Sequence, residues 1–329
     1  MLCADLSPWL LRLWAVLVGA AVGSFLNVAI HRWPLGMSVV TPGSHCPACG
    51  AKVRAWHNIP IFAYLWLRGR AACCGARLSP RYLLVESLMA LLAWALVERY
   101  VVAAAPDVAL APQLLQAALY GGFVAVLLVC TFVDLQWMEI PDEASLPGTA
   151  VGLASFAWRP DIRAEDVATG AGLGFLLVQL IFVWFYERLT GRRGMGEGDA
   201  KLLMCIGAFL GWQGVVFALA AGSIQGILAV ILAAFSGRPL HSTTQAQPTS
   251  SATANNTSPS DDAPAEAPDA ASEQATQDMG PGGLKIPFGP FLALAALEFL
   301  FFGEPILTWY QRLTGLTTLT LRAWGIPIA

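Results

Sequence analysis

Two aspartates in this sequence stand where long apolar runs meet polar stretches. Asp134 follows Thr131-Phe132-Val133, and Asp199 follows Gly196-Glu197-Gly198. A carboxylate at the edge of the membrane hydrocarbon is unfavourable unless it is paired or hydrated, so it is a candidate for function. Two such groups on separate helices and on one side of a membrane form the pair that acid–base hydrolysis requires. We predict that Asp134 and Asp199 are catalytic.

Charge repulsion defines how such a pair would work. Two carboxylates in one site cannot both ionise easily, so one keeps its proton. The ionised group acts as a general base on water, and the protonated group donates to the scissile carbonyl. Each residue also has a simpler interpretation on its own: Asp134 as a boundary residue that reaches water, and Asp199 as the cap of a helix after a glycine hinge.

Four neighbouring residues are candidates for supporting roles. Gly196 and Gly198 permit backbone angles closed to other residues and would let an extended peptide approach Asp199. Asp142 follows an Ile-Pro turn and can cap the next helix, so we interpret it as structural. Lys201 is two residues beyond Asp199, which points its side chain away along a helix, and we assign it no catalytic role.

A second group of chemically active residues is rich in cysteine. Cys46-Pro47-Ala48-Cys49-Gly50 is typical of one half of a zinc knuckle. A regular second half would place cysteines at 71 and 74, but position 71 is alanine, so Cys73 would join Cys74 as a ligand. We predict a zinc site at Cys46, Cys49, Cys73 and Cys74. Unliganded cytosolic thiols are the alternative, and His45 or His57 could also complete the site.

The composition places these residues in a membrane protein. The chain is 56% hydrophobic and 12% charged, about half the charge of an ordinary soluble domain. We predict an all-α polytopic protein with about eight membrane-spanning helices and a small cytoplasmic loop domain that resembles a zinc knuckle. The first apolar run is long enough to span a membrane, so it reads as a retained helix and not as a cleaved signal.

The spans follow from the apolar runs. Six runs are long, and two shorter ones at 144–158 and 200–213 complete the count of eight. The six long runs cover residues 9–30, 83–105, 114–133, 167–186, 214–235 and 286–303.

Lysine and arginine set the expected orientation. The loop after the first span is rich in both, which places it in the cytoplasm and the N-terminus outside. Alternation through the spans then puts both aspartates on the cytoplasmic face. Glu86, just inside the second span, should be paired, although its neighbour Arg81 is poorly spaced for a helical contact.

The domain organisation follows the same pattern. Residues 236–285 are rich in Ser, Thr, Ala and Pro, which predicts a disordered cytoplasmic linker. We therefore expect a first transmembrane helix at 1–30, a cysteine-containing loop at 31–81 and a transmembrane core at 82–235. After the linker, residues 286–329 hold the last span and an interfacial tail.

Taken together, these motifs are similar to those of a known family. The sequence resembles the prepilin peptidases, also called type 4 prepilin leader peptidases, over nearly all its length except the linker and the far tail. The shared motifs are Gly23–Val28 with Arg32 and Pro34, Cys46 with Cys49, Asn58–Pro60, Leu67–Arg70, Arg81–Glu86, Asp134 with Ile140–Asp142, and Gly196–Asp199 with Lys201 and Leu202.

The resemblance implies a membrane aspartic protease of the bacterial inner membrane with Asp134 and Asp199 as its catalytic pair. Members cut the basic leader from type IV prepilins and pseudopilins, which serve pili and type II secretion. Many also methylate the new N-terminus with S-adenosylmethionine, an activity associated with the cysteine loop. The resemblance implies prepilins and lipid as partners, and no nucleic acid.

The sequence departs from the family pattern at two positions, and two other functions are alternatives. Ala71 replaces an expected cysteine, which bears on zinc binding and methylation, and Leu83 replaces a common proline. One alternative is a peptidase that lacks methyltransferase activity. The other is a non-enzymatic carrier or scaffold, which should show paired interrupted spans in two matching halves. We find no such repeat.

Overall fold

A computed structural model describes residues 7–46, 48–104, 109–191, 196–235 and 287–314. Within these residues the chain is helical and forms no strand, and its extended backbone pairs at two isolated bridges, His45 with Lys52 and Arg70 with Arg77. The prediction of an all-α protein is therefore confirmed.

The helices follow one another along the chain with short connections. In order they are α1 (Pro8–Arg32), η1 (Trp33–Leu35), η2 (Ala55–Asn58), α2 (Phe62–Trp66), α3 (Arg81–Val97), η3 (Glu98–Val102), α4 (Leu110–Trp137), α5 (Asp142–Ala154), η4 (Ser155–Trp158), α6 (Ala164–Leu177), η5 (Val178–Phe185), α7 (Tyr186–Thr190), α8 (Glu197–Phe235) and α9 (Gly289–Thr314).

Five helical stretches among the described residues are long and apolar enough to cross a membrane. They are Pro8–Leu35, Leu110–Trp137, Ala164–Leu189, Glu197–Phe235 and Gly289–Ile306. These five stretches overlap five of the six long predicted spans, but the count of eight is not confirmed. The helices at 83–105 and 144–158 do not meet these criteria, and 200–213 belongs to α8. A break inside α8 explains the last difference, since Gly211 has φ 71° and ψ −175° and separates the two predicted segments.

The first and third helices pack closely through small residues. A Cβ atom on Gly23 would lie 2.7 Å from Cα of Glu86, so only glycine permits this approach. The Asn27 side chain donates to the carbonyl of Tyr82 at 3.2 Å. Gly23 and Asn27 thus face protein, while His31, one turn further along the same face, is exposed.

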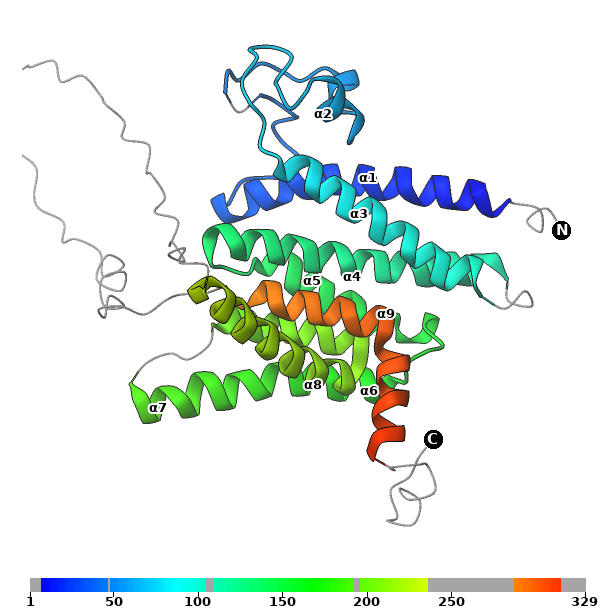
Figure 1. Ribbon diagram of the computed structural model, residues 1–329, viewed down its shortest axis with the longest axis vertical. Helices are drawn as coiled ribbons and strands as arrows, with labels where there is room; N and C mark the ends of the chain where they lie inside the picture. Colours follow the sequence, from blue (N-terminus) through cyan, green and yellow to red (C-terminus); the bar gives the residue numbers. More distant parts are fainter. Residues whose placement is uncertain (1–6, 47, 105–108, 192–195, 236–286, 315–329) are drawn as a thin grey trace, which may run out of the picture. The chain divides into compact units, whose positions relative to one another are not determined.

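Helix α4 lies in the middle of the helical layers (Figure 1), between the α1–α3 pair and α9. Three of its apolar residues, Phe123, Val124 and Leu127, are completely buried. Because both faces of α4 pack against other helices, the position of its last turn is fixed by the core. Asp134 lies in that turn.

A buried arginine fixes the neighbourhood of the break in α8. Arg159 is 1% exposed, and its guanidinium donates to the carbonyls of Gly152, Ala208 and Phe209 at 2.8 to 3.0 Å. These carbonyls lie near the ends of helical segments, where no backbone N–H reaches them. The Arg159 contacts therefore hold α5 and the first half of α8 together, an arrangement that the sequence did not predict.

The predicted domain boundaries remain predictions. The expected linker at 236–285 lies outside the described residues, and so does 315–329. The part of the expected tail that is described, 304–314, continues α9 as a helix.

Candidate active site and cysteine cluster

Asp134 is buried in the last turn of α4. Its carbonyl accepts a hydrogen bond of 2.9 Å from the N–H of Met138, whose left-handed backbone ends the helix. The side chain is 5% exposed. Its Oδ2 atom accepts a hydrogen bond of 2.9 Å from the backbone N–H of Gly289. A buried carboxylate is therefore held by a donor from a distant part of the chain.

Gly289 is the first residue of α9, and the sequence analysis did not identify it. A Cβ atom at this position would lie 2.7 Å from Oδ2 of Asp134, so a side chain there would displace the carboxylate. The N–H groups at the start of a helix favour negative charge. A glycine between prolines at the start of a span, as in Pro287-Phe288-Gly289-Pro290, is the sequence signal that could have indicated this position.

Asp199 lies in the first turn of α8. Its N–H donates to the carbonyl of Gly196 at 3.1 Å, and α8 begins at Glu197. Asp199 is thus inside the first turn and not in the position before the helix, although its carboxylate hydrogen bonds to the backbone of Gly196, which directly precedes the helix. Gly196 is exposed just before the helix, while a Cβ atom on Gly198 would lie 3.0 Å from Cβ of Ile140.

Ile140 packs against two glycines, Gly198 beside Asp199 and Gly289 beside Asp134. Besides its approach to Gly198, its Cδ1 atom lies 3.3 Å from the Cβ position of Gly289, the donor to Asp134. The carboxyl groups of Asp134 and Asp199 are close enough to interact electrostatically. Two carboxyl groups that share one site can divide the roles of general base and general acid.

The predicted supporting residues Asp142 and Lys201 form an ion pair. The Lys201 ammonium donates to both carboxylate oxygens of Asp142, at 2.6 and 2.7 Å. Asp142 is the first residue of α5, and its side chain makes no cap, because Pro141 occupies the cap position. The prediction that Asp142 caps the helix is therefore wrong, and the pair instead links α5 to α8.

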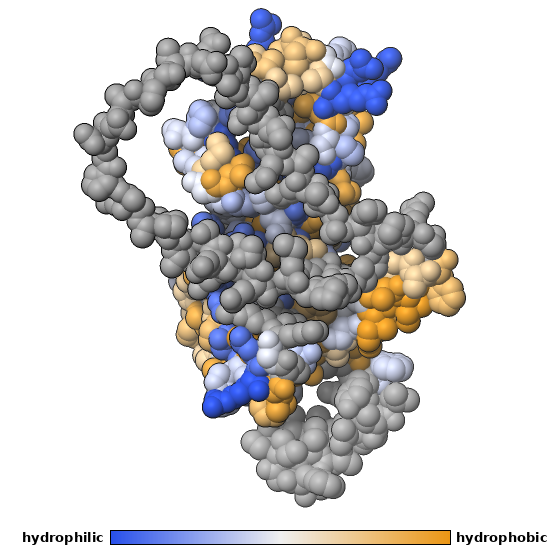
Figure 2. Space-filling view, turned by 90° about the vertical axis from the view of Figure 1, so that its left-hand side faces the viewer, coloured by the Kyte–Doolittle hydropathy of each residue, from blue (hydrophilic) through white to orange (hydrophobic). Residues whose placement is uncertain are grey.

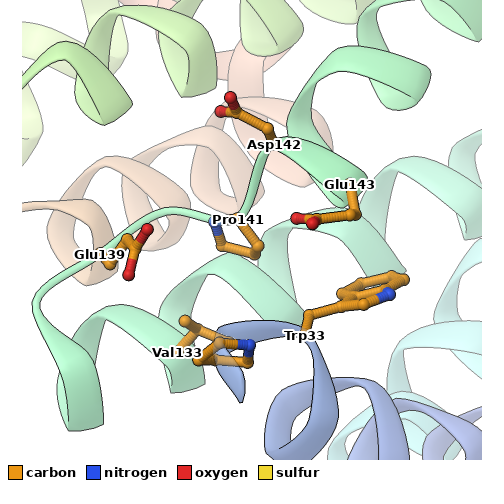
Figure 3. Close-up of a pocket in the computed structure, with 7 residues that line it drawn as sticks. Trp33, Val133, Glu139, Pro141, Asp142 and Glu143 are labelled. Atoms are coloured by element: carbon orange, nitrogen blue, oxygen red, sulfur yellow. The ribbon is translucent and has the colours of Figure 1, made fainter. Parts of the chain in front are cut away.

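A small cavity lies next to Asp134, although neither aspartate lines it. It has a volume of about 170 Å³ and is lined by the residues in Figure 3: Trp33, Pro34, Val133, Glu139, Pro141, Asp142 and Glu143. The carboxylate of Asp142 points away from Trp33 in this view, consistent with its bond to Lys201. Glu139 and Glu143 give this cavity negative charge, while Lys201 balances the charge of Asp142.

The four predicted cysteine ligands come together in the loop between α1 and α3. All four sulfur atoms lie within 4.8 Å of one another, with Cys46 to Cys74 at 3.8 Å and Cys49 to Cys73 at 3.3 Å. In a zinc–thiolate tetrahedron with bonds of about 2.3 Å, sulfur atoms lie about 3.8 Å apart. The donor set and its spacing therefore fit a zinc ion.

Two similar turns build this cluster. In the first, the N–H of Gly50 donates to the Cys46 carbonyl at 2.9 Å. In the second, the N–H of Gly75 donates to the Ala71 carbonyl at 2.8 Å, and both glycines have left-handed φ angles. Ala71 thus occupies the position of Cys46 in the matching turn. Cys73, two residues further on, supplies the missing sulfur.

The thiols of the cluster differ in acidity. The backbone N–H groups of Ala48 and Cys49 hydrogen bond to Cys46 and lower the pKa of its thiol to about 6. The pKa of Cys73 is raised to about 12, chiefly because its thiol hydrogen bonds to Cys49 and Cys46. The lowered pKa of Cys46 favours its thiolate, which is the form that binds metals.

Helix α3 is bonded to α4 close to Asp134 and to the loop through Glu86. Arg81, at the start of α3, donates to Oε1 of Gln136 on α4 at 2.6 Å. Glu86 does not pair with Arg81, the neighbour considered from the sequence. Its carboxylate accepts the backbone N–H of Ile61 at 2.7 Å.

Comparisons with known proteins match both parts of the chain. Residues 17–100 match the bacterial peptidase A24 N-terminal domain, and residues 122–232 match the type IV leader peptidase family. The chain is 32% identical to a prepilin leader peptidase/N-methyltransferase of Aeromonas hydrophila, over 92% of this chain and 94% of the relative. A relative of the same name in Myxococcus xanthus is 32% identical, over 89% of this chain and 91% of the relative. No solved structure matches the chain significantly.

Proposed function

Because the chain belongs to the type IV leader peptidase family, we propose that it is a membrane aspartic endopeptidase that removes the basic leader from type IV prepilins and pseudopilins. We further propose that it methylates the new N-terminus with S-adenosylmethionine as methyl donor. The observation that carries the peptidase proposal is the approach of two acidic side chains, from α4 and α8, around Ile140.

In the proposed reaction Asp134 and Asp199 share one proton. The ionised carboxyl group removes a proton from a water molecule, whose oxygen attacks the scissile carbonyl carbon. The protonated group gives its proton to the carbonyl oxygen, so a neutral tetrahedral intermediate forms. As the C–N bond breaks, the group that took the water proton passes it to the amine nitrogen. One hydroxyl of the intermediate returns a proton to the other group as the new carbonyl forms. We treat the dyad as one titrating unit.

Backbone hydrogen bonds to the two carboxyl groups support this division of labour. A carboxylate that accepts a backbone N–H at the start of a helix is stabilised in its charged form. Gly289 binds Asp134 in this way and Gly196 binds Asp199, so either carboxyl group can be the ionised one. The proposal therefore assigns the base and the acid to the dyad as a unit. The negative charge beside Val133 is complementary to a basic leader, which suits the proposed substrates.

Zinc is proposed as a structural cofactor held by Cys46, Cys49, Cys73 and Cys74. A zinc ion there would cross-link the two turns of the loop. The geometry of the sulfur atoms supports this assignment despite Ala71. For S-adenosylmethionine, the proposal rests on the names of the relatives alone, and we assign no residues to its pocket.

The membrane-spanning helices support a multi-pass protein in a lipid bilayer. We propose the bacterial inner membrane as its location, with the N-terminus in the periplasm and the dyad on the cytoplasmic side. The excess of lysine and arginine between α1 and α3 supports this orientation. A carrier or scaffold without activity is disfavoured, because the chain belongs to a peptidase family.

The proposal is tested with the purified full-length protein and a synthetic prepilin. Mass spectrometry should detect a mature chain that lacks its leader, and labelled S-adenosylmethionine should transfer its methyl group to the new N-terminus. Cleavage without methyl transfer would favour the peptidase that lacks methyltransferase activity. An intact prepilin under conditions that support a related enzyme would contradict the peptidase proposal.

A further inference from the structure

The loop between α1 and α3 exposes large apolar side chains over one short stretch, Trp56–Trp66. Trp56 is 78% exposed, Trp66 75%, Leu65 59% and Phe62 56%. The rings of Phe62 and Trp66 stack with centroids 5.7 Å apart, so α2 presents them as a pair. Exposed apolar side chains gathered in this way mark a contact surface. We call this stretch the aromatic segment.

The charge around the aromatic segment has a single sign. From Trp33 to Pro80 the sequence contains no aspartate or glutamate. All the basic side chains of this stretch are exposed, and Figure 2 shows hydrophobic and hydrophilic side chains side by side at the top, where α2 lies in Figure 1. They are Lys52, Arg54, Arg68, Arg70 and Arg77. We therefore expect this surface to bind a partner that has both an apolar region and negative charge.

A buried carboxylate fixes the position of the aromatic segment along the axis of α3. The backbone N–H of Ile61 donates to Oε2 of Glu86, a residue of α3 that is only 6% exposed. Glu86 is the sixth residue of α3, about 7.5 Å along the axis from its first residue at about 1.5 Å per residue. The start of α2 is thus held back along the side of the helices and does not extend beyond their ends.

The backbone of Ile61 is strained, which indicates that tertiary contacts hold the aromatic segment in place. Ile61 has φ 63°, a left-handed angle that is unfavourable for a β-branched residue. Such a conformation persists only where surrounding contacts hold it. The bond to Glu86 supplies one such contact, so the segment is a fixed part of the fold and not a free loop.

We propose that the aromatic segment lies in the interface of the lipid leaflet next to the loop and that its basic neighbours bind anionic phospholipid headgroups. The loop follows α1, a candidate membrane-spanning helix, which keeps the start of the loop at the membrane surface. Tryptophan with arginine is the combination that membrane interfaces favour. Acidic headgroups complement the five unopposed cations. This role is separate from the proposed hydrolysis and does not use the dyad.

The test uses the full chain in lipid nanodiscs, with the photocrosslinking residue p-benzoylphenylalanine in place of Trp66. A matched protein carries it in place of Ala51, which is also exposed in the loop but lies outside the aromatic segment. Each is irradiated in phosphatidylcholine alone and in a mixture with phosphatidylglycerol, with and without added prepilin. Mass spectrometry then identifies the adducts.

The proposal predicts lipid adducts at position 66 in much greater yield than at position 51, and a several-fold rise in yield when phosphatidylglycerol is present. The double variant Arg54→Gln/Arg70→Gln should lose that rise and keep the adducts. Equal yields at the two positions would overturn the proposal. So would adducts at position 66 with prepilin or with a second copy of the chain in place of lipid. These results do not depend on peptidase activity.

Discussion

The backbone N–H of Gly289 donates a hydrogen bond of 2.9 Å to the carboxylate of Asp134, from a residue 155 positions away. The contact brings the start of α9 to the last turn of α4. It also leaves no room for a side chain at position 289, because a Cβ atom there would lie 2.7 Å from Oδ2. This relationship connects α9 to the proposed chemistry.

Gly289→Ala should impair catalysis more than folding. The added methyl group must push the Asp134 carboxylate aside, and misplacing a catalytic group by about 1 Å costs about 10²-fold in rate. Prepilin cleavage rates measure the effect. Gly122→Ala in α4 is the control, since a Cβ atom at that glycine meets nothing within 4 Å. Similar rates for both variants would show that Gly289 does not position Asp134.

The two glycines before Asp199 should differ in sensitivity. A methyl group on Gly198 would press on Ile140 at 3.0 Å, whereas one on Gly196 would meet Asp199 Oδ2 at an ordinary 3.7 Å. Gly198→Ala should therefore lower the cleavage rate by about 10-fold or more, and Gly196→Ala should have a smaller effect. Steady-state kinetics of both variants decide this point, and the reverse order would contradict the packing around Ile140.

The ion pair between Lys201 and Asp142 should contribute modestly to stability and not to chemistry. The Asp142 side chain is 51% exposed, so solvent screens the pair, and we expect a coupling energy below about 1 kcal/mol. A double-mutant cycle with Lys201→Met and Asp142→Asn, read by thermal unfolding in detergent, measures it. If Lys201→Met abolishes cleavage in a folded protein, the non-catalytic assignment is wrong.

Metal binding should depend on Cys73 and not on the regular spacing of the second turn. Cys73→Ser should lower the zinc content of the purified protein, measured by elemental mass spectrometry, because it removes one of the four sulfur atoms. Ala71→Cys combined with Cys73→Ala should restore it, since position 71 matches that of Cys46 in the first turn. Cys130→Ala, a buried cysteine in α4, is the control. Unchanged zinc in Cys73→Ser would place the fourth ligand elsewhere.

The sequence predicts many of the helices and candidate site residues, because an apolar run and an acidic residue at its end are both visible in a short stretch of sequence. Apolar runs located α1, α4 and α9 to within a few residues, apart from the extension of α9. The positions of Asp134 and Asp199 at the polar ends of such runs were enough to select them. The cysteine spacing was enough to suggest that Cys73 replaces the ligand missing at position 71.

The remaining features depend on tertiary contacts that local rules do not encode. The capping rule for Asp142 considers only its own helix, whereas its partner Lys201 lies 59 residues away. The contact of Gly289 with Asp134 joins residues that are 155 positions apart. Glu86 is paired with a backbone N–H from the loop, a partner that no side-chain pattern reveals. The span count differs instead for local reasons: α5 is only 13 residues long, and the continuous stretch of α3 and η3 carries the charged residues Glu86, Glu98 and Arg99.

The central claim is that Asp134 and Asp199 act together on one water molecule. The most direct measurement is prepilin cleavage by the purified variants Asp134→Asn and Asp199→Asn, each checked for folding by its zinc content and its elution in detergent. Loss of either carboxyl group should lower the rate by about 10²–10⁴-fold or more, with the double variant no worse than the single ones. Cleavage at the wild-type rate by either folded variant would contradict the account.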